Sequence, residues 1–339
     1  MIQNIIEKSL AGDLLTEKEI KELFNVPLFS KESLHLLWAA RKKSIQVSRG
    51  IAEVHAQIGL NISPCPKNCL FCSFAAKNKV FIDSFELPID DAISQAKQFE
   101  MENANAIYLM TTAHYPFEKY IETSKEIRQS LKADTVLIAN IGDFSEAQAQ
   151  ELKHVGFSGI YHAVRLGEGK DTTISIKKRL QTMANAREAG LLIGTCLEPV
   201  GPEHTIDELV QKTIITREVQ PVYSGAARRI PIPQTALVLH GIVTEGHMAL
   251  VLAVVRLALN DIIVGNCTHE PNLPGAFAGA NLLWAEVGSN PRDTIKETEK
   301  KRGMSVKDCT RILNDAGWNV RTSPSEFFST QKFVSGKHL

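Results

Sequence analysis

Three of the six cysteines in this chain lie in one short stretch, NISPCPKNCLFCSFAAKN, residues 61–78. Cys65, Cys69 and Cys72 have the spacing C-x3-C-x2-C. Thiolates at this spacing can jointly bind a soft metal ion or an iron–sulfur cluster. Because three thiolates are an incomplete ligand set for most metals, the group in the fourth position decides the chemistry of the site.

Several metal sites agree with this triplet. A structural zinc site needs four ligands, usually in two close pairs, and the chain has no second C-x2-C. A [4Fe-4S] cluster on four protein thiolates would require a distant cysteine, namely Cys196, Cys267 or Cys309. A cluster on three thiolates would leave one iron open to an external ligand, as at catalytic metal sites.

The segment CLEPVGPEHT, residues 196–205, ends an apolar run and carries Glu198, Glu203 and His204. These acidic and imidazole groups could bind a substrate or a cofactor. In the structural alternative, GPEHT forms a turn and Thr205 caps the next helix. We expect Glu198 to contact a cofactor.

Other polar side chains are candidates for contact with a substrate. ARRIPIP, residues 227–233, has two adjacent arginines on an expected strand, so at most one of them should face a carboxylate substrate. NCTHEP, residues 266–271, has a cysteine and a histidine that could share one face and bind a metal or a substrate, with ordinary packing as the alternative. The candidate substrate contacts are His114, Cys196, Arg228, Arg229, Cys267, His269 and Glu270.

From about residue 53 onward, short apolar runs alternate with amphipathic helical segments. Strands are expected at 52–62, 105–110, 135–140, 159–164, 191–199, 222–230, 261–266 and 275–283. Helices are expected at 88–101, 117–131, 145–156, 176–190, 205–219 and 247–259. This alternation predicts a parallel (βα)8 barrel of TIM type, complete or partial, with a doubly wound open sheet as the competitor. No G-x-G-x-x-G follows the first strand, which argues against a dinucleotide-binding sheet.

The chain divides into three expected parts. Residues 1–50 read as an N-terminal helical extension, residues 51–285 as the barrel, and residues 286–339 as a C-terminal loop and helix that close it. The cysteine triplet follows the first expected strand. In a parallel barrel, the loops after the strands form the catalytic face, so the triplet should lie there.

The bulk composition is that of a globular protein. Lys+Arg and Asp+Glu both number 38 among 339 residues, which argues against a general electrostatic grip on nucleic acid or acidic lipid. No apolar run is long enough for a membrane span, and the start lacks the pattern of a secretory signal. Few and unevenly spaced cysteines suggest ligands in a reducing compartment, and we expect the cytoplasm.

With the aromatic Phe71 directly before its last cysteine, the triplet resembles the signature of radical S-adenosylmethionine (SAM) enzymes. In that family a [4Fe-4S] cluster on three cysteines binds SAM through its open iron. One electron from the cluster then cleaves SAM to a 5′-deoxyadenosyl radical, which abstracts hydrogen from a substrate. The resemblance extends at lower identity over about residues 50–317, to the biotin synthase-like branch with its hydrogenase-cofactor maturases and methylornithine synthase. The segments that carry it are IGDFSEAQAQELKHVGFSGIYHAV, KKRLQTMANAREAGLLIG, FAGANLLW and LNDAGW.

The resemblance implies one [4Fe-4S] cluster on the triplet and SAM as the second cofactor. Arg179 matches the arginine that pairs with the carboxylate of SAM. Thr111 and Thr112 stand where many relatives have a Gly-Gly-Glu turn for the amino group of SAM. The backbone near Phe71 and Ser73 is implied to face the adenine, and the other implied contacts to SAM are His162, Arg165 and Glu168.

One departure narrows the expected reaction. Biotin synthase holds a second, internal cluster, and the matching positions here are Leu109, Ile138, Gly194 or Thr195, and Gly265, none of them cysteine or arginine. We therefore expect an enzyme like the hydrogenase-cofactor maturases. It would act on a small molecule in cofactor biosynthesis, take electrons from a ferredoxin or flavodoxin, and bind neither nucleic acid nor membrane. The alternatives are a sulfur-inserting enzyme like biotin or lipoyl synthase and, in another class, a non-catalytic iron–sulfur or zinc-binding module.

Overall fold

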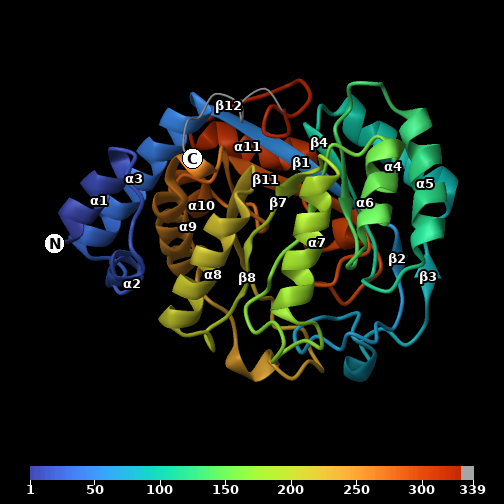
Figure 1. Ribbon diagram of the computed structural model, residues 1–339, viewed down its shortest axis with the longest axis horizontal. Coiled ribbons are helices and arrows are strands. Elements are labelled where there is room, and N and C mark those ends of the chain that lie inside the picture. Colours follow the sequence, from blue (N-terminus) through green and yellow to red (C-terminus); the bar gives the residue numbers. More distant parts are fainter. Residues whose placement is uncertain (330–339) are drawn as a thin grey trace.

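A ring of parallel strands occupies the centre of the molecule in a computed structural model, which describes residues 1–329 (Figure 1). Parallel pairing of Gly265–Thr268 with residues 223–226 closes the ring, so the open sheet is excluded. The described residues thus form the (βα)8 barrel that the sequence predicts. Its strands are, in order around the ring, β1 (Ile51–Gly59), β4 (Ala106–Met110), β5 (Leu137–Asn140), β6 (Gly159–Tyr161), β7 (Leu192–Gly194), β9 (Tyr223–Arg228), β10 (Gly265–Thr268) and β11 (Leu282–Gly288).

Helices connect successive strands and cover the outside of the barrel (Figure 1). Local capping fixes where several of them begin. Thr205 and Glu208 form a reciprocal capping box, as do Ser145 and Gln148. These connecting helices are α4 (Ile89–Met101), α5 (Phe117–Ser130), α6 (Glu146–Val155), α7 (Ile176–Glu188), α8 (Ile206–Val219) and α9 (Glu245–Leu259).

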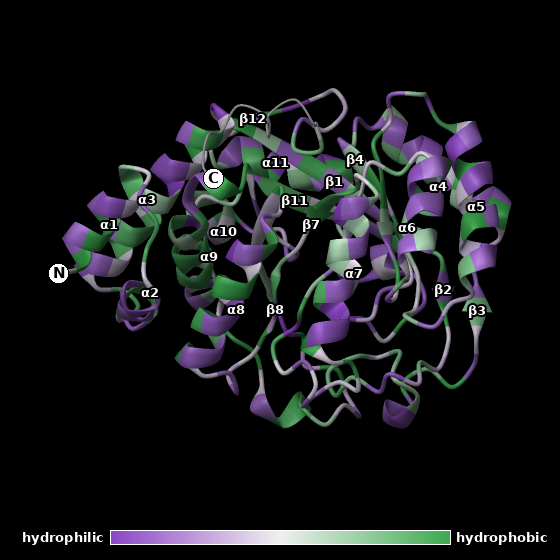
Figure 2. Ribbon diagram, viewed as in Figure 1, coloured by the Kyte–Doolittle hydropathy of each residue, from purple (hydrophilic) through white to green (hydrophobic). Residues whose placement is uncertain are grey.

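Three N-terminal helices, α1 (Ile2–Leu10), α2 (Glu17–Phe24) and α3 (Lys31–Ser48), pack together against α9. From Met248 to Leu259 every residue of α9 is buried, because the N-terminal helices cover the side that the barrel leaves free. Figure 2 accordingly shows α9 as predominantly hydrophobic, whereas α4, α5 and α7 alternate between hydrophilic and hydrophobic residues. None of the described helices is long and apolar enough to cross a membrane.

The barrel differs from the predicted strands at three places. The predicted strand 275–283 is wrong, since α10 (Leu273–Phe277), capped by Asn272, precedes β11. The predicted strand 261–266 is shifted, because a 3-10 turn (Asn260–Ile262) follows α9 before β10 begins. The predicted strand 191–199 is split into β7 and β8 (Leu197–Val200), and β8 pairs with β9 across a register shift.

Short elements at both ends of the barrel were not predicted. An antiparallel pair, β2 (Asn61–Ile62) and β3 (Phe85–Glu86), brackets the cysteine loop. At the other end, β12 (Asn319–Val320) follows α11 (Val306–Asp315) and pairs with the start of β1. The expected C-terminal part begins within β11, and residues 330–339 lie outside the described residues. The three-part division of the chain therefore stays a prediction.

The inside of the barrel is packed and mostly aromatic. Tyr108, Tyr223 and Trp284 fill it together with Cys196 and Cys267, and all five side chains are fully buried. The amino end of the barrel is covered by residues 325–328, whose backbone and Ser325 hydroxyl donate to the buried carboxylate of Glu53. Only the carboxyl end of the barrel is left for a binding site.

Candidate active site

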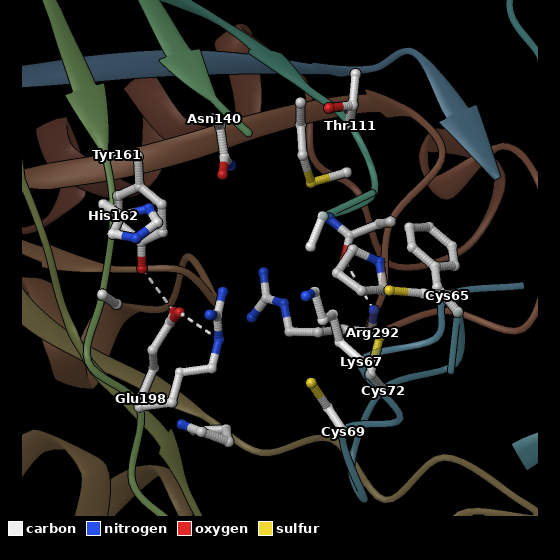
Figure 3. Close-up of a pocket in the computed structure, with 18 of the residues that line it drawn as sticks. Cys65, Lys67, Cys69, Cys72, Thr111, Asn140, Tyr161, His162, Glu198 and Arg292 are labelled. Carbon is white, nitrogen blue, oxygen red and sulfur yellow. Dashed lines mark hydrogen bonds and ion pairs between the residues drawn. The ribbon is translucent and has the colours of Figure 1, made fainter. Parts of the chain in front are cut away.

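The cysteine triplet lies on a loop between β2 and β3, beyond the carboxyl end of β1. Cys65 N donates to Phe74 O at 2.7 Å, which folds the loop back on itself. The amide of Asn78 donates to the carbonyl oxygens of Cys69 (3.2 Å) and Cys72 (2.8 Å). These bonds occupy backbone groups of the loop, and all three cysteines line one cavity (Figure 3).

This cavity lies at the carboxyl ends of the strands. Its walls include Thr111 after β4, Asn140 at the end of β5, His162 after β6 and His269 after β10. Its empty space, counted out into the open mouth, is about 1110 Å³, and it lies at the end of the barrel where small-molecule sites of this fold occur.

Burial raises the pKa of each triplet thiol, that of Cys72 to about 12. Repulsion from the neighbouring thiolates adds to this rise at Cys69 and Cys72, because the three sulfurs are close together. Such thiols ionise only beside a compensating positive charge, which the iron ions of a cluster supply. Among the described residues that line the cavity there is no fourth cysteine, so the donor set fits a [4Fe-4S] cluster with one iron open.

A buried network of charged groups forms the wall that carries the start of α7. Arg179 Nε donates to Glu168 Oε2 (3.1 Å), and its Nη1 lies 3.5 Å from Asp143 Oδ2. His162 Nε2 lies 3.1 Å from Asp143 Oδ1, and Arg165 N donates to Glu168 Oε2 (3.0 Å). Burial lowers the pKa of His162 to about 4, so its imidazole is neutral at pH 7. Burial alone would raise the pKa of Asp143, but the bond from His162 and the charge of Arg179 hold it well below its usual range.

The predicted SAM contacts near the triplet divide into two groups. The Thr111 hydroxyl lines the cavity, is buried and has no hydrogen-bond partner among the described residues. A polar ligand would satisfy it, as the amino group of SAM would. Phe71 also lines the cavity. In contrast, Thr112 exchanges hydrogen bonds with Asn61, and the Ser73 hydroxyl donates to a backbone carbonyl of the C-terminal loop, so neither side chain lines the cavity.

Glu198 lies across the cavity from the cysteines (Figure 3). Its Oε2 accepts from Tyr161 Oη at 2.6 Å, and its Oε1 lies 3.4 Å from Arg165 Nε. These two partners fix the orientation of the carboxylate. Glu198 thus lines the cavity, and its contact with a cofactor stays a prediction. Glu168 does not line the cavity; it accepts hydrogen bonds from the Arg179 side chain and from the backbone amide of Arg165.

Sequence reasoning missed Arg292, which lines the cavity from the loop after β11. Its guanidinium is paired with Glu270 and, at 3.2 Å, with Glu286. Lys67, inside the cysteine loop, was missed as well and also lines the cavity. The signal for Arg292 was its place in GSNPRD directly after the last strand, since such loops form the catalytic face.

Neither of the two arginines that were candidates for a substrate contact, Arg228 and Arg229, lines the cavity. Arg229 is paired with Glu203 at 2.6 Å, and the Arg228 guanidinium donates to Val243 O at 3.2 Å. Arg228 is the last residue of β9, and Arg229 follows the strand. His204 accepts from Gly201 N, as expected for the alternative in which GPEHT is a turn.

The remaining substrate candidates differ in their distance from the cavity. His269 lines it, while Cys196 and Cys267 lie in the packed interior of the barrel. His114 lies 3.2 Å from the hydroxyl of Ser63 and does not line the cavity. Glu270 reaches it only through its ion pair with the arginine after β11.

Comparisons with known proteins agree with this arrangement. A model of the radical SAM superfamily matches residues 63–213. The biotin synthase of Nitrosopumilus maritimus is 23% identical over 273 residues, which cover 78% of this chain and 82% of that protein. The FeFe-hydrogenase maturase HydG from Carboxydothermus hydrogenoformans superposes with a TM-score of 0.79 at 18% identity, over 97% of this chain and 81% of that chain. Methylornithine synthase (PylB) superposes with a TM-score of 0.76 at 16% identity, over 95% of this chain and 98% of that chain.

The two superpositions establish a shared fold, and the superfamily match covers the cysteine triplet together with the wall that contains Arg179. Residues 63–213 thus carry a radical SAM domain, and the chain is similar to a biotin synthase over 78% of its length. This similarity indicates an enzyme with a [4Fe-4S] cluster and SAM as its cofactors.

Proposed function

We propose that this enzyme uses SAM to abstract hydrogen from a small, carboxylate-bearing substrate in the barrel, in a step of cofactor biosynthesis like those of hydrogenase maturases. The observation that carries the proposal is that the three thiols and four basic side chains face one cavity at the carboxyl end of the barrel. When bound, the cluster supplies the electron that cleaves SAM to the 5′-deoxyadenosyl radical.

The residues of the chain hold SAM at its polar ends. Arg179 offers a guanidinium that suits the carboxylate of SAM. The unpartnered hydroxyl of Thr111 accepts a hydrogen bond from the amino group. The ring of Phe71 lies beside the last thiol of the triplet and packs against the adenine. His162 stays neutral near pH 7, so it adds no repulsion next to the sulfonium.

Basic side chains of the cavity wall can also bind the substrate. Lys67, Arg165, Arg179 and Arg292 line the cavity and supply donors for anionic groups. Arg292 lies on the loop after β11, outside the wall assigned to SAM, and suits the carboxylate of an amino-acid-like substrate. The FeFe-hydrogenase maturase and methylornithine synthase share this fold, and the first of them supports the place in cofactor assembly.

Sulfur insertion from an internal cluster is not favoured by the barrel interior. In the described part of the chain, the buried apolar group inside the barrel contains only two cysteines, Cys196 and Cys267. Leu109, which matches a ligand position of the internal cluster in biotin synthase, packs in the core between the strands and α4–α6 and so faces the outer layer of helices.

We propose a ferredoxin or flavodoxin as the source of the electron.

Cluster reconstitution under anaerobic conditions tests the proposal. The purified protein should bind about four irons per chain and release 5′-deoxyadenosine when SAM and dithionite are added. A substrate deuterated at the reacting carbon should then place deuterium in the 5′-deoxyadenosine. Cys309→Ala is a matched control, because this buried thiol lies in α11 outside the cavity, and it should retain both properties. Iron-loaded protein that never cleaves SAM would refute the proposal.

A further inference from the structure

Beneath the floor of the cavity, two thiols and one imidazole come together from different strands. Cys196 lies between β7 and β8, Cys267 lies on β10, and His269 follows it. One ligand atom from each lies within 4.8 Å of the others, and all three residues are buried. Both cysteines are free thiols. The described residues provide no further histidine, cysteine, aspartate or glutamate within this group.

From this geometry we infer that Cys196, Cys267 and His269 form a mononuclear zinc site, separate from the iron–sulfur triplet, with a fourth coordination position left for water or a ligand from the cavity. Two thiolates and an imidazole are a preferred zinc set, and sites with three protein ligands are open ones. Bonds of about 2.0–2.3 Å to one tetrahedral ion bring the ligand atoms to about 3.6–3.8 Å from one another. Each side chain needs to move by about 1 Å or less from its present place to reach that spacing.

The imidazole gives an independent indication of a ligand. His269 is only 7% exposed, and its Nε2 is buried with no hydrogen-bond partner among the described residues. A buried polar atom without a partner is destabilising, and coordination to a metal ion would satisfy it. Its ring is also held in place, because it stacks on Trp284 with centroids 4.6 Å apart and lies 5.4 Å from Tyr161.

The protonation states agree with a metal ligand set. Burial lowers the pKa of His269 well below its usual range, so the imidazole is neutral and its nitrogen lone pair is available. Burial and the adjacent Cys267 raise the pKa of the Cys196 thiol well above its usual range. This thiol therefore ionises only with a compensating positive charge beside it. A dipositive ion supplies that charge.

The zinc and iron contents of the complete, iron-loaded enzyme test the inference. After exposure to one equivalent of zinc and removal of the excess, the wild type should hold about four irons and about one zinc per chain. Cys196→Ala/Cys267→Ala should keep the irons and lose at least about nine-tenths of the zinc. Cys309→Ala, which removes an equally buried cysteine outside the group, should keep both metals. The iron content shows whether each variant is folded, and it is measured without SAM cleavage. Absence of zinc from iron-loaded protein would therefore refute the zinc site and leave the proposed function untouched.

A second measurement does not depend on folding of the double variant. In Cys65→Ala/Cys69→Ala/Cys72→Ala, added Co²⁺ should give thiolate-to-cobalt charge-transfer absorption, which zinc abolishes. His269→Phe keeps the ring over Trp284 and should weaken zinc binding by at least about 10-fold. Zinc below about 0.1 per chain in the wild type, zinc retained without the two cysteines, or copper held in its place would each overturn the inference.

Discussion

Replacing Arg179 with glutamine tests how the wall at α7 holds SAM. Arg179 is 3% exposed, lines the cavity and contacts two carboxylates. A hydrogen bond between charged groups contributes about 1.5–3 kcal/mol. Since each 1.4 kcal/mol is a factor of ten in affinity, loss of the contact to the SAM carboxylate should raise the Kd for SAM by about 10- to 100-fold.

The same substitution also removes a cation from between Glu168 and Asp143. Removing one partner of a buried ion pair costs about 3–5 kcal/mol. Glu168 still accepts from the Thr172 hydroxyl (2.6 Å) and from Arg165 N (3.0 Å), so we expect the lower end of that range. Arg179→Lys keeps the positive charge but offers fewer hydrogen-bond donors than the guanidinium. It should recover most of the stability and only part of the affinity.

Two assays separate these effects. Calorimetric titration of SAM into reconstituted protein of matched iron content gives Kd, and urea unfolding of the apoprotein gives stability. Lys177→Gln is the matched control, because Lys177 lies on the same turn of α7, is exposed and does not line the cavity. A Kd for Arg179→Gln within about threefold of the wild-type value would refute the assignment of Arg179 to SAM.

Three further substitutions test the buried polar groups. His162 binds a proton at about pH 6.5 in the unfolded chain but only at about pH 4 in the folded protein, so the free energy of unfolding decreases as the pH is lowered from 6.5 to 4. His162→Gln should therefore reduce the loss of stability between pH 7.5 and pH 5 by about 2 kcal/mol, measured by urea unfolding of the apoprotein. Glu286→Gln should lower the free energy of unfolding by about 3 kcal/mol, because this buried carboxylate pairs with both Arg292 and Arg302, although each arginine keeps a second carboxylate; the exposed Glu297→Gln should cost about 1 kcal/mol or less, and equal losses would contradict this reasoning. Glu53→Gln should speed hydrogen exchange at the Phe327 amide by about 10-fold, measured by mass spectrometry, and unchanged exchange would show that this bond does not hold the segment.

Local signals predicted the helices well. The Thr205–Glu208 capping box and the cap at Ser145 are short-range features, and α8 and α6 begin where these residues place them. The triplet was equally readable, because its three thiols lie on one loop and need no distant partner. Its place on the catalytic face then followed from the rule that parallel barrels carry their sites after the strands.

Long-range features could not be predicted from the same signals. Arg292 reaches the cavity only because the loop after β11 folds across the barrel mouth, where the arginine pairs with Glu270 and Glu286. The two adjacent arginines of ARRIPIP read as a substrate site, yet Arg229 is paired with Glu203 from the neighbouring turn. Such pairings depend on tertiary contacts between distant residues, which residue type and spacing do not reveal.

The central claim is that the three thiols hold a cluster with one iron open to SAM. Electron paramagnetic resonance of the reduced, reconstituted protein, recorded with and without SAM, tests this most directly. We expect a [4Fe-4S]⁺ signal that changes on addition of SAM and that disappears in Cys69→Ala but persists in Cys309→Ala. A signal that SAM leaves unchanged, or a cluster that survives the loss of Cys69, would contradict the claim.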